Sequence, residues 1–124
     1  MRLVLVIASA ALAIAIGSAA AQSQMELNAQ AAGDLRKSDE RLNAVYNRLR
    51  AKISDAGKKS LQTAQQSWLR FRDQECEFET MGTVGGSIHS MIVAICLTRL
   101  TDQRIKDLEA QLNCKEGDLS CGGQ

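Results

Sequence analysis

Apolar residues recur at helical spacing along most of this chain, and that periodicity limits the folds open to it more than any other feature. Steps of three, four or seven residues place apolar side chains in one stripe along a helix. The first such stripe comprises Leu35, Leu42, Val45 or Tyr46, Leu49 and Ile53. The chain contains no proline, the residue that most strongly interrupts a helix. Together these features predict an all-α protein.

The pattern divides into three helices. The first is expected from near Met25 to about Asp55–Gly57, with Gly57 as its C-terminal cap. The second is expected from about Lys59 to Glu79. Its stripe comprises Leu61, Ala64, Trp68, Phe71 and Phe78.

Three glycines in "TMGTVGGS" (80–87) interrupt the helical pattern, and the Ser87 hydroxyl is expected to accept from the first amides of the third helix. The stripe of this helix comprises Ile88, Met91 or Ile92, Ile95, Leu100, Ile105, Leu108 and Leu112. The sequence thus predicts a small antiparallel three-helix bundle over residues 22–112, followed by a short polar tail over 113–124 that carries cysteine and glycine.

The N-terminus has the features of a signal peptide. Residues 1–21 carry one positive charge at Arg2, an apolar run up to Ile16, and Ala19 and Ala21 at the −3 and −1 positions of a cleavage site. The run is shorter than the roughly 20 residues of a spanning helix. We expect export to the periplasm or secretion, with no stable membrane insertion after cleavage. A retained N-terminal anchor is the alternative.

The charge balance argues against some partners. The chain has 15 basic and 14 acidic residues, and cleavage after Ala21 would remove Arg2 and leave the mature protein formally neutral. General nucleic-acid binders and membrane-surface binders normally show a basic excess. We therefore expect no nucleic-acid partner.

Four cysteines follow the signal segment: Cys76, Cys96, Cys114 and Cys121. An even number in a short exported chain predicts two disulfides, with a zinc site or free thiols as alternatives. The sequence has no C-x-x-C motif and a single histidine, which disfavours zinc. Four cysteines allow three pairings. Cys96 is the natural partner of Cys76, provided that the glycine segment folds back or the third helix overshoots.

The stretch "WLRFRDQECE" (68–77) combines aromatic rings with charges. Arg72 is expected to join Asp39 and Arg104 in a semi-buried ionic cluster, since guanidinium groups hold carboxylates by two bonds. Four acids follow one another closely: Asp73, Glu75, Glu77 and Glu79. Such a run usually forms a solvated face, but it also suits a strongly basic partner.

Four blocks in order, "SDERLNAVYNRL" (38–49), "LQTAQQSWLRFRDQEC" (61–76), "GGS" (85–87) and "CLTRLTDQR" (96–104), resemble the LprI-like lysozyme-inhibitor family of small exported bacterial proteins. The matching positions that we expect to form a structural cluster are Asp39, Tyr46, Trp68, Phe71, Arg72, Asp73, Thr101 and Arg104. This chain has Gln30 where relatives often carry an early cysteine. A late cysteine such as Cys114 then lacks its usual partner, and Cys121 offers a local substitute. The resemblance therefore implies the pairs Cys76–Cys96 and Cys114–Cys121. It also implies inhibition of lysozyme-type muramidases.

The sequence offers no catalytic constellation and implies no cofactor or metal. His89 lies beside the glycine turn, far from any triad partner, and is expected to be a surface histidine rather than a catalytic base. A binding protein is expected instead. The candidate partner contacts are Glu75, Glu77, Glu79, Gly85, Gly86, Ser87 and His89. The alternative function is a periplasmic adaptor or an immunity-type protein with a partner other than lysozyme.

Overall fold

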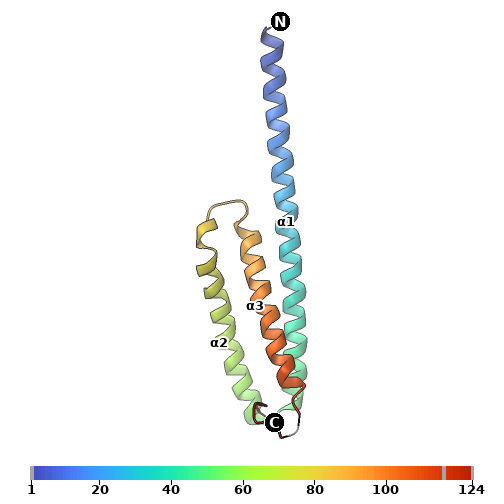
Figure 1. Ribbon diagram of the computed structural model, residues 1–124, viewed down its shortest axis with the longest axis vertical. Helices are drawn as coiled ribbons and strands as arrows, with labels where there is room; N and C mark the ends of the chain where they lie inside the picture. The colour runs from blue at the N-terminus through green and yellow to red at the C-terminus, as the bar shows by residue number, and fades with distance from the viewer. Residues whose placement is uncertain (1, 116, 124) are drawn as a thin grey trace.

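Three long helices make up the computed structural model, which describes residues 2–115 and 117–123. Helix α1 spans Arg2–Lys52, α2 spans Asp55–Glu79 and α3 spans His89–Leu112, with the short 3₁₀ helix η1 at Met81–Thr83. Figure 1 shows α2 and α3 as a hairpin beside the C-terminal part of α1, whose N-terminal part extends alone beyond the bundle. The predicted all-α, antiparallel three-helix fold is confirmed.

Helix α1 begins far earlier than the sequence pattern predicted. The expected start near Met25 is wrong, because α1 runs without a break from Arg2. Alanine is the commonest residue of the added segment, and it is the strongest helix former. Within the described residues, no helix combines the length and the apolar character needed to cross a membrane.

The corner between α1 and α2 also differs from the prediction. Helix α1 already ends at Lys52, and Ser54 caps α2 by accepting a hydrogen bond from the Gly57 amide at 3.2 Å. A serine followed by an acidic first turn is a strong signal for a helix start. Gly57 therefore lies buried in the first turn of α2, and its predicted role as a cap of α1 is wrong.

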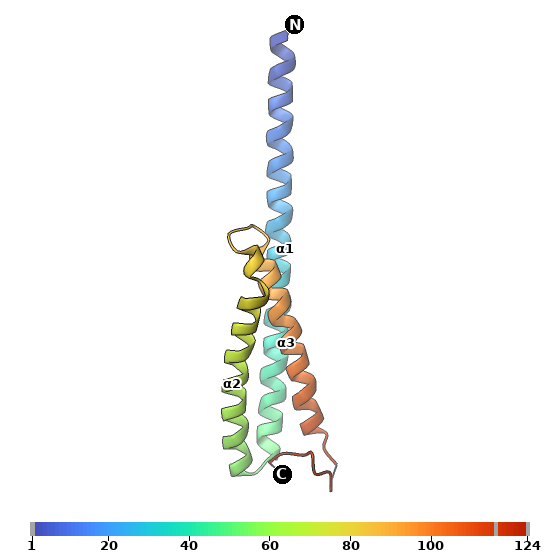
Figure 2. The same ribbon diagram turned by 60° about the vertical axis from the view of Figure 1, so that its left-hand side comes forward.

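The core lies between α1 and α3. Its buried members are Leu42, Val45, Leu49, Ile53, Ile105, Leu108 and Leu112. Tyr46, Leu61 and Trp68 pack against them partly buried. These contacts confirm the predicted stripe of α1 and the C-terminal half of the stripe of α3. Figure 1 shows α1 and α3 side by side with α2 somewhat apart, and in the view of Figure 2 the lower part of α1 lies between α2 and α3.

Several residues of the predicted stripes are exposed and lie outside the core, Ala64 among them. Phe71 and Phe78 on α2 are 52% and 69% exposed, and Ile88 and Ile95 are 40% and 53% exposed. On α2 the buried or half-buried row consists of Leu61, Gln65, Trp68, Arg72 and Cys76, at helical steps of three and four. The disulfide and the polar contacts of this row set the rotation of α2, so its phenylalanines face outward.

The Cys76–Cys96 disulfide joins α2 to α3 with its Cα atoms 5.7 Å apart. Cys76 lies close to the end of α2, whereas Cys96 lies nearly two turns into α3. Helix η1 extends the α2 side of the hairpin by about one turn, which compensates for this offset. Thr80 fixes the junction, because its hydroxyl donates to the Cys76 carbonyl at 2.7 Å.

The C-terminal tail crosses the base of the bundle and returns to the α1–α2 corner. A second disulfide, Cys114–Cys121, closes the loop that begins this return. The Ser54 amide donates to the Gly123 carbonyl at 2.8 Å. A Cβ atom at Gly57 would lie only 2.7 Å from the Gly123 Cα atom, so the close approach requires glycine. Both pairs implied by the family resemblance are present.

Candidate functional site

The segment that joins α2 to α3, residues 80–89, forms the tip of the hairpin. It lies at the opposite end of the hairpin from the α1–α2 corner and the tail (Figure 1). Gly85 has a φ of 84°, a backbone conformation that residues with a side chain rarely adopt. At Gly86 a Cβ atom would lie 3.2 Å from the Thr83 carbonyl oxygen. The glycines therefore set the sharp path of the tip.

His89 braces the tip from within. Its Nδ1 atom lies 2.8 Å from the Thr83 hydroxyl, and that hydroxyl donates to the Thr80 carbonyl at 2.8 Å. Because the hydroxyl has one proton, Nδ1 carries a proton and donates it to Thr83. His89 is the first residue of α3 and is half-buried. The His89 side chain therefore stabilises the conformation of the tip.

Ser87 does not have its predicted role. The N-cap position of α3 is Ile88, which has no side-chain capping bond. The Ser87 carbonyl instead accepts a hydrogen bond from the Asn28 side-chain amide at 3.1 Å. This bond ties the tip to α1, so all three helices fix its position.

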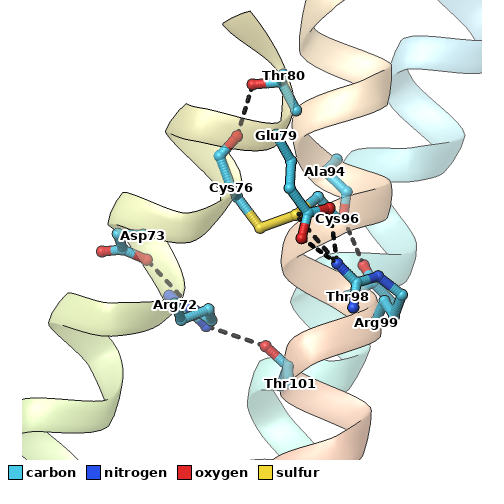
Figure 3. The surroundings of a disulfide bond; sticks show 10 residues. All are labelled: Arg72, Asp73, Cys76, Glu79, Thr80, Ala94, Cys96, Thr98, Arg99 and Thr101. Carbon is cyan, nitrogen blue, oxygen red and sulfur yellow. Dashed lines mark hydrogen bonds and ion pairs between the residues drawn. A yellow bond between two sulfur atoms is a disulfide. The ribbon is translucent and has the colours of Figure 1, made fainter.

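The four acids before the tip have different surroundings. Arg99 holds both carboxylate oxygens of Glu79 at 2.8 Å beside the disulfide (Figure 3). Asp73 accepts from the Arg72 Nε at 3.0 Å. Glu75 and Glu77 have no basic side chain within ion-pair distance in the part of the chain that the structure describes. The charges of these two carboxylates are therefore not neutralised by an ion pair within the described residues.

Exposed apolar side chains surround the same end of α2. Phe78 is 69% exposed, Met81 64% and Val84 71%. Below them lies a groove of about 560 Å³ between α2 and α3. Its lining residues are Asp73, Cys76, Glu77, Thr80, Met81, Val84, His89, Val93 and Leu97. The tip thus presents apolar side chains next to two acids that have no ionic partner among the residues the structure describes.

Arg72 connects the three helices below the disulfide. Its Nη1 donates to Asp39 on α1 at 2.9 Å and to the fully buried Thr101 on α3 at 3.1 Å. The bond to Thr101 is drawn in Figure 3. The Arg72 side chain is only 12% exposed and Thr101 is fully buried, so the bond between them is shielded from water, whereas the Asp39 side chain is 42% exposed. Their geometry makes Arg72 a structural clamp.

Arg104 does not reach this clamp. Its Nε donates to the Gln65 side chain at 3.0 Å, and its guanidinium lies 5.8 Å from the centre of the Trp68 ring. The Arg72 guanidinium lies 5.4 Å from the same ring. Burial lowers the pKa of Arg104, and the nearby Asp107 partly opposes that shift. Two arginines thus flank Trp68, but the predicted ionic cluster is incomplete: Arg72 is paired with Asp39, whereas Arg104 is bonded to Gln65.

Among the described residues, one group has the ligand types of a metal site. Cys114, Asp118 and Cys121 bring their ligand atoms within 4.8 Å of one another. The two sulfurs are joined in a disulfide, and a metal binds thiolates rather than disulfide sulfurs. This group therefore closes the tail loop.

Comparison with known proteins shows which family and which relative the chain resembles. The family described as "Lysozyme inhibitor LprI" matches residues 16–108. An uncharacterized protein of Rhizobium meliloti (strain 1021) is 32% identical over 105 residues, covering 74% of this chain and 76% of that protein. No solved structure matches the chain. The matched region contains the three bundled helices almost completely and the whole tip.

Proposed function

Because this chain belongs to the LprI family of lysozyme inhibitors, we propose that it inhibits a lysozyme-type muramidase by direct contact through the tip. The observation that carries the proposal is the grouping at one end of the hairpin. Exposed apolar side chains and a glycine-shaped loop meet there with two acids that form no ion pair within the described part of the chain, whereas the other end is covered by the tail.

The chemistry of the tip suits such a partner. Muramidases of this type bind their glycan in a cleft that holds two catalytic carboxylates, and a narrow loop can enter a cleft that a flat surface cannot. Glu75 and Glu77 would steer a basic enzyme toward the tip. The bonds from Asn28 and His89 already order the loop, which lowers the entropy lost on binding.

The proposed action is binding without catalysis. His89, the only histidine of the chain, uses its Nδ1 to brace Thr83. The remaining groups of the tip are methyls, backbone amides and hydroxyls, and their contacts with one another hold the loop in shape. Inhibition would follow from occupying the cleft and excluding the glycan.

The protein would act outside the cytoplasm, in the periplasm or after secretion. Two disulfides persist only in an oxidising compartment. Cleavage after Ala21 would remove the part of α1 that extends beyond the bundle and would retain every core residue of that helix. We therefore propose residues 1–21 as the signal peptide and residues 22–124 as the active form.

The direct test uses oxidised protein comprising residues 22–124, titrated into egg-white lysozyme digesting a peptidoglycan suspension. We expect stoichiometric inhibition. The variant Glu75→Gln/Glu77→Gln should inhibit more weakly, most clearly at low salt, where electrostatic steering is strongest. A matched control, Glu40→Gln/Glu109→Gln, removes two charges away from the tip and should inhibit normally. Full enzyme activity at excess protein, with egg-white lysozyme and with other lysozyme types, would refute the proposal.

A further inference from the structure

Phe71 and Phe78 are the only phenylalanines of the chain, and both face solvent on α2. A spacing of seven residues places them on one line along the helix, two turns apart. This line lies opposite Cys76, whose side chain is buried against α3. Beyond the end of α2, Met81 and Val84 in the tip are 64% and 71% exposed, and both line the groove between α2 and α3.

The fixed orientation of α2 keeps these two rings outside the core of the bundle. The disulfide fixes α2 against α3, and the Arg72 clamp fixes it against both other helices. Rotating α2 to bury Phe71 would break both. Single exposed apolar residues are ordinary, but two aligned aromatic rings close to a tip with further exposed apolar residues indicate an interaction surface.

The acidic residues beside this line indicate which class of partner would bind the outer face of α2. Glu75 lies on one side of it and Glu77 on the other, and neither has a basic partner among the described residues. An anionic membrane would be repelled by these carboxylates. A second copy of the chain would bring the same acids toward one another. A protein with an apolar recess bordered by basic residues fits best.

We propose that Phe71 and Phe78 anchor the outer face of α2 on the rim of the basic partner that the tip enters. This inference rests on the proposed function and extends the contact from the tip along two turns of α2. Aromatic anchors of this kind carry a large share of binding energy at protein interfaces. The tip then places the inhibitor in the cleft, while the two rings hold it there.

The test compares Phe71→Ser/Phe78→Ser with a control of similar character on the other helices, Leu27→Ser/Ile95→Ser. The control residues are 45% and 53% exposed and lie on α1 and α3. Inhibition of egg-white lysozyme is measured for each variant, with thermal unfolding and sedimentation velocity alongside. We expect the phenylalanine variant to inhibit at least about 10-fold more weakly with little change in melting temperature, and the control to inhibit normally.

The outcomes separate the two proposals. If the phenylalanine variant inhibits as well as the wild type, this inference fails and the proposed function stands. If the wild type inhibits no muramidase, both fail. If the wild type sediments as a dimer and the phenylalanine variant as a monomer, a second copy occupies the face and the inference is overturned. The single variants Phe71→Ser and Phe78→Ser supply the same comparison should the double variant not fold.

Discussion

Removing the Cys76–Cys96 disulfide tests how the hairpin is held to the rest of the protein. The bond closes a loop with a sequence separation of 20 residues, and the chain-entropy relation gives about 3 kcal/mol of stabilisation for a loop of that size. Helix α2 makes few other contacts with α1, and its two phenylalanines contribute little burial. The disulfide should therefore supply a large part of the free energy of unfolding of this small domain.

The perturbation is Cys76→Ala/Cys96→Ala in residues 22–124, and the assay is thermal unfolding followed by circular dichroism. A loss of about 3 kcal/mol corresponds to a fall in Tm of roughly 10–20 °C for a domain of this size. Cys114→Ala/Cys121→Ala is the comparison, because its loop lies in the exposed tail and its opening need not unfold the helices. A fall in Tm of under about 3 °C for Cys76→Ala/Cys96→Ala would refute this reasoning. So would a fall for Cys114→Ala/Cys121→Ala that exceeds the fall for Cys76→Ala/Cys96→Ala.

Three further predictions concern the clamp and the tail. Arg72→Met should lower the free energy of unfolding by about 2 kcal/mol in urea titrations, and Arg72→Lys should not restore it, because one ammonium cannot reproduce the guanidinium's bonds. Gly57→Ala should displace the tail and abolish hydrogen-exchange protection of the Ser54 amide, while the helices remain folded. Hydrogen bonds from Ser120 lower the pKa of Asp118. Their contribution to the tail loop is therefore present above the ordinary carboxyl pKa and lost as pH falls through the lowered one. In an NMR titration, Ser120→Ala should raise that pKa toward its ordinary value.

Much of the fold could be predicted because the strongest signals in the sequence are local. The stripe of α1 contains the core residues Leu42, Leu49 and Ile53, and the glycines at 85 and 86 mark the tip. The rotation of α2 could not be predicted from apolar periodicity, because its inward row includes Gln65 and Arg72. Those polar residues become inward-facing only through partners on other helices, which spacing along one helix does not reveal.

The candidate site was predictable in location but not in detail. The glycine turn and the acids before it indicated the tip. The pairing of Glu79 with Arg99 joins residues on different helices, and the bond between His89 and Thr83 depends on the path of the loop. The role of Gly57 depends on the tail, which returns from the far end of the sequence to contact it.

The central claim is that the tip and the outer face of α2 form the inhibitory surface, and hydrogen exchange on the complex with egg-white lysozyme tests it most directly. Binding should slow exchange of amides within residues 71–89 and leave the tail at 113–123 unchanged. Protection confined to α1 and the C-terminal half of α3, with residues 71–89 unaffected, would contradict the account.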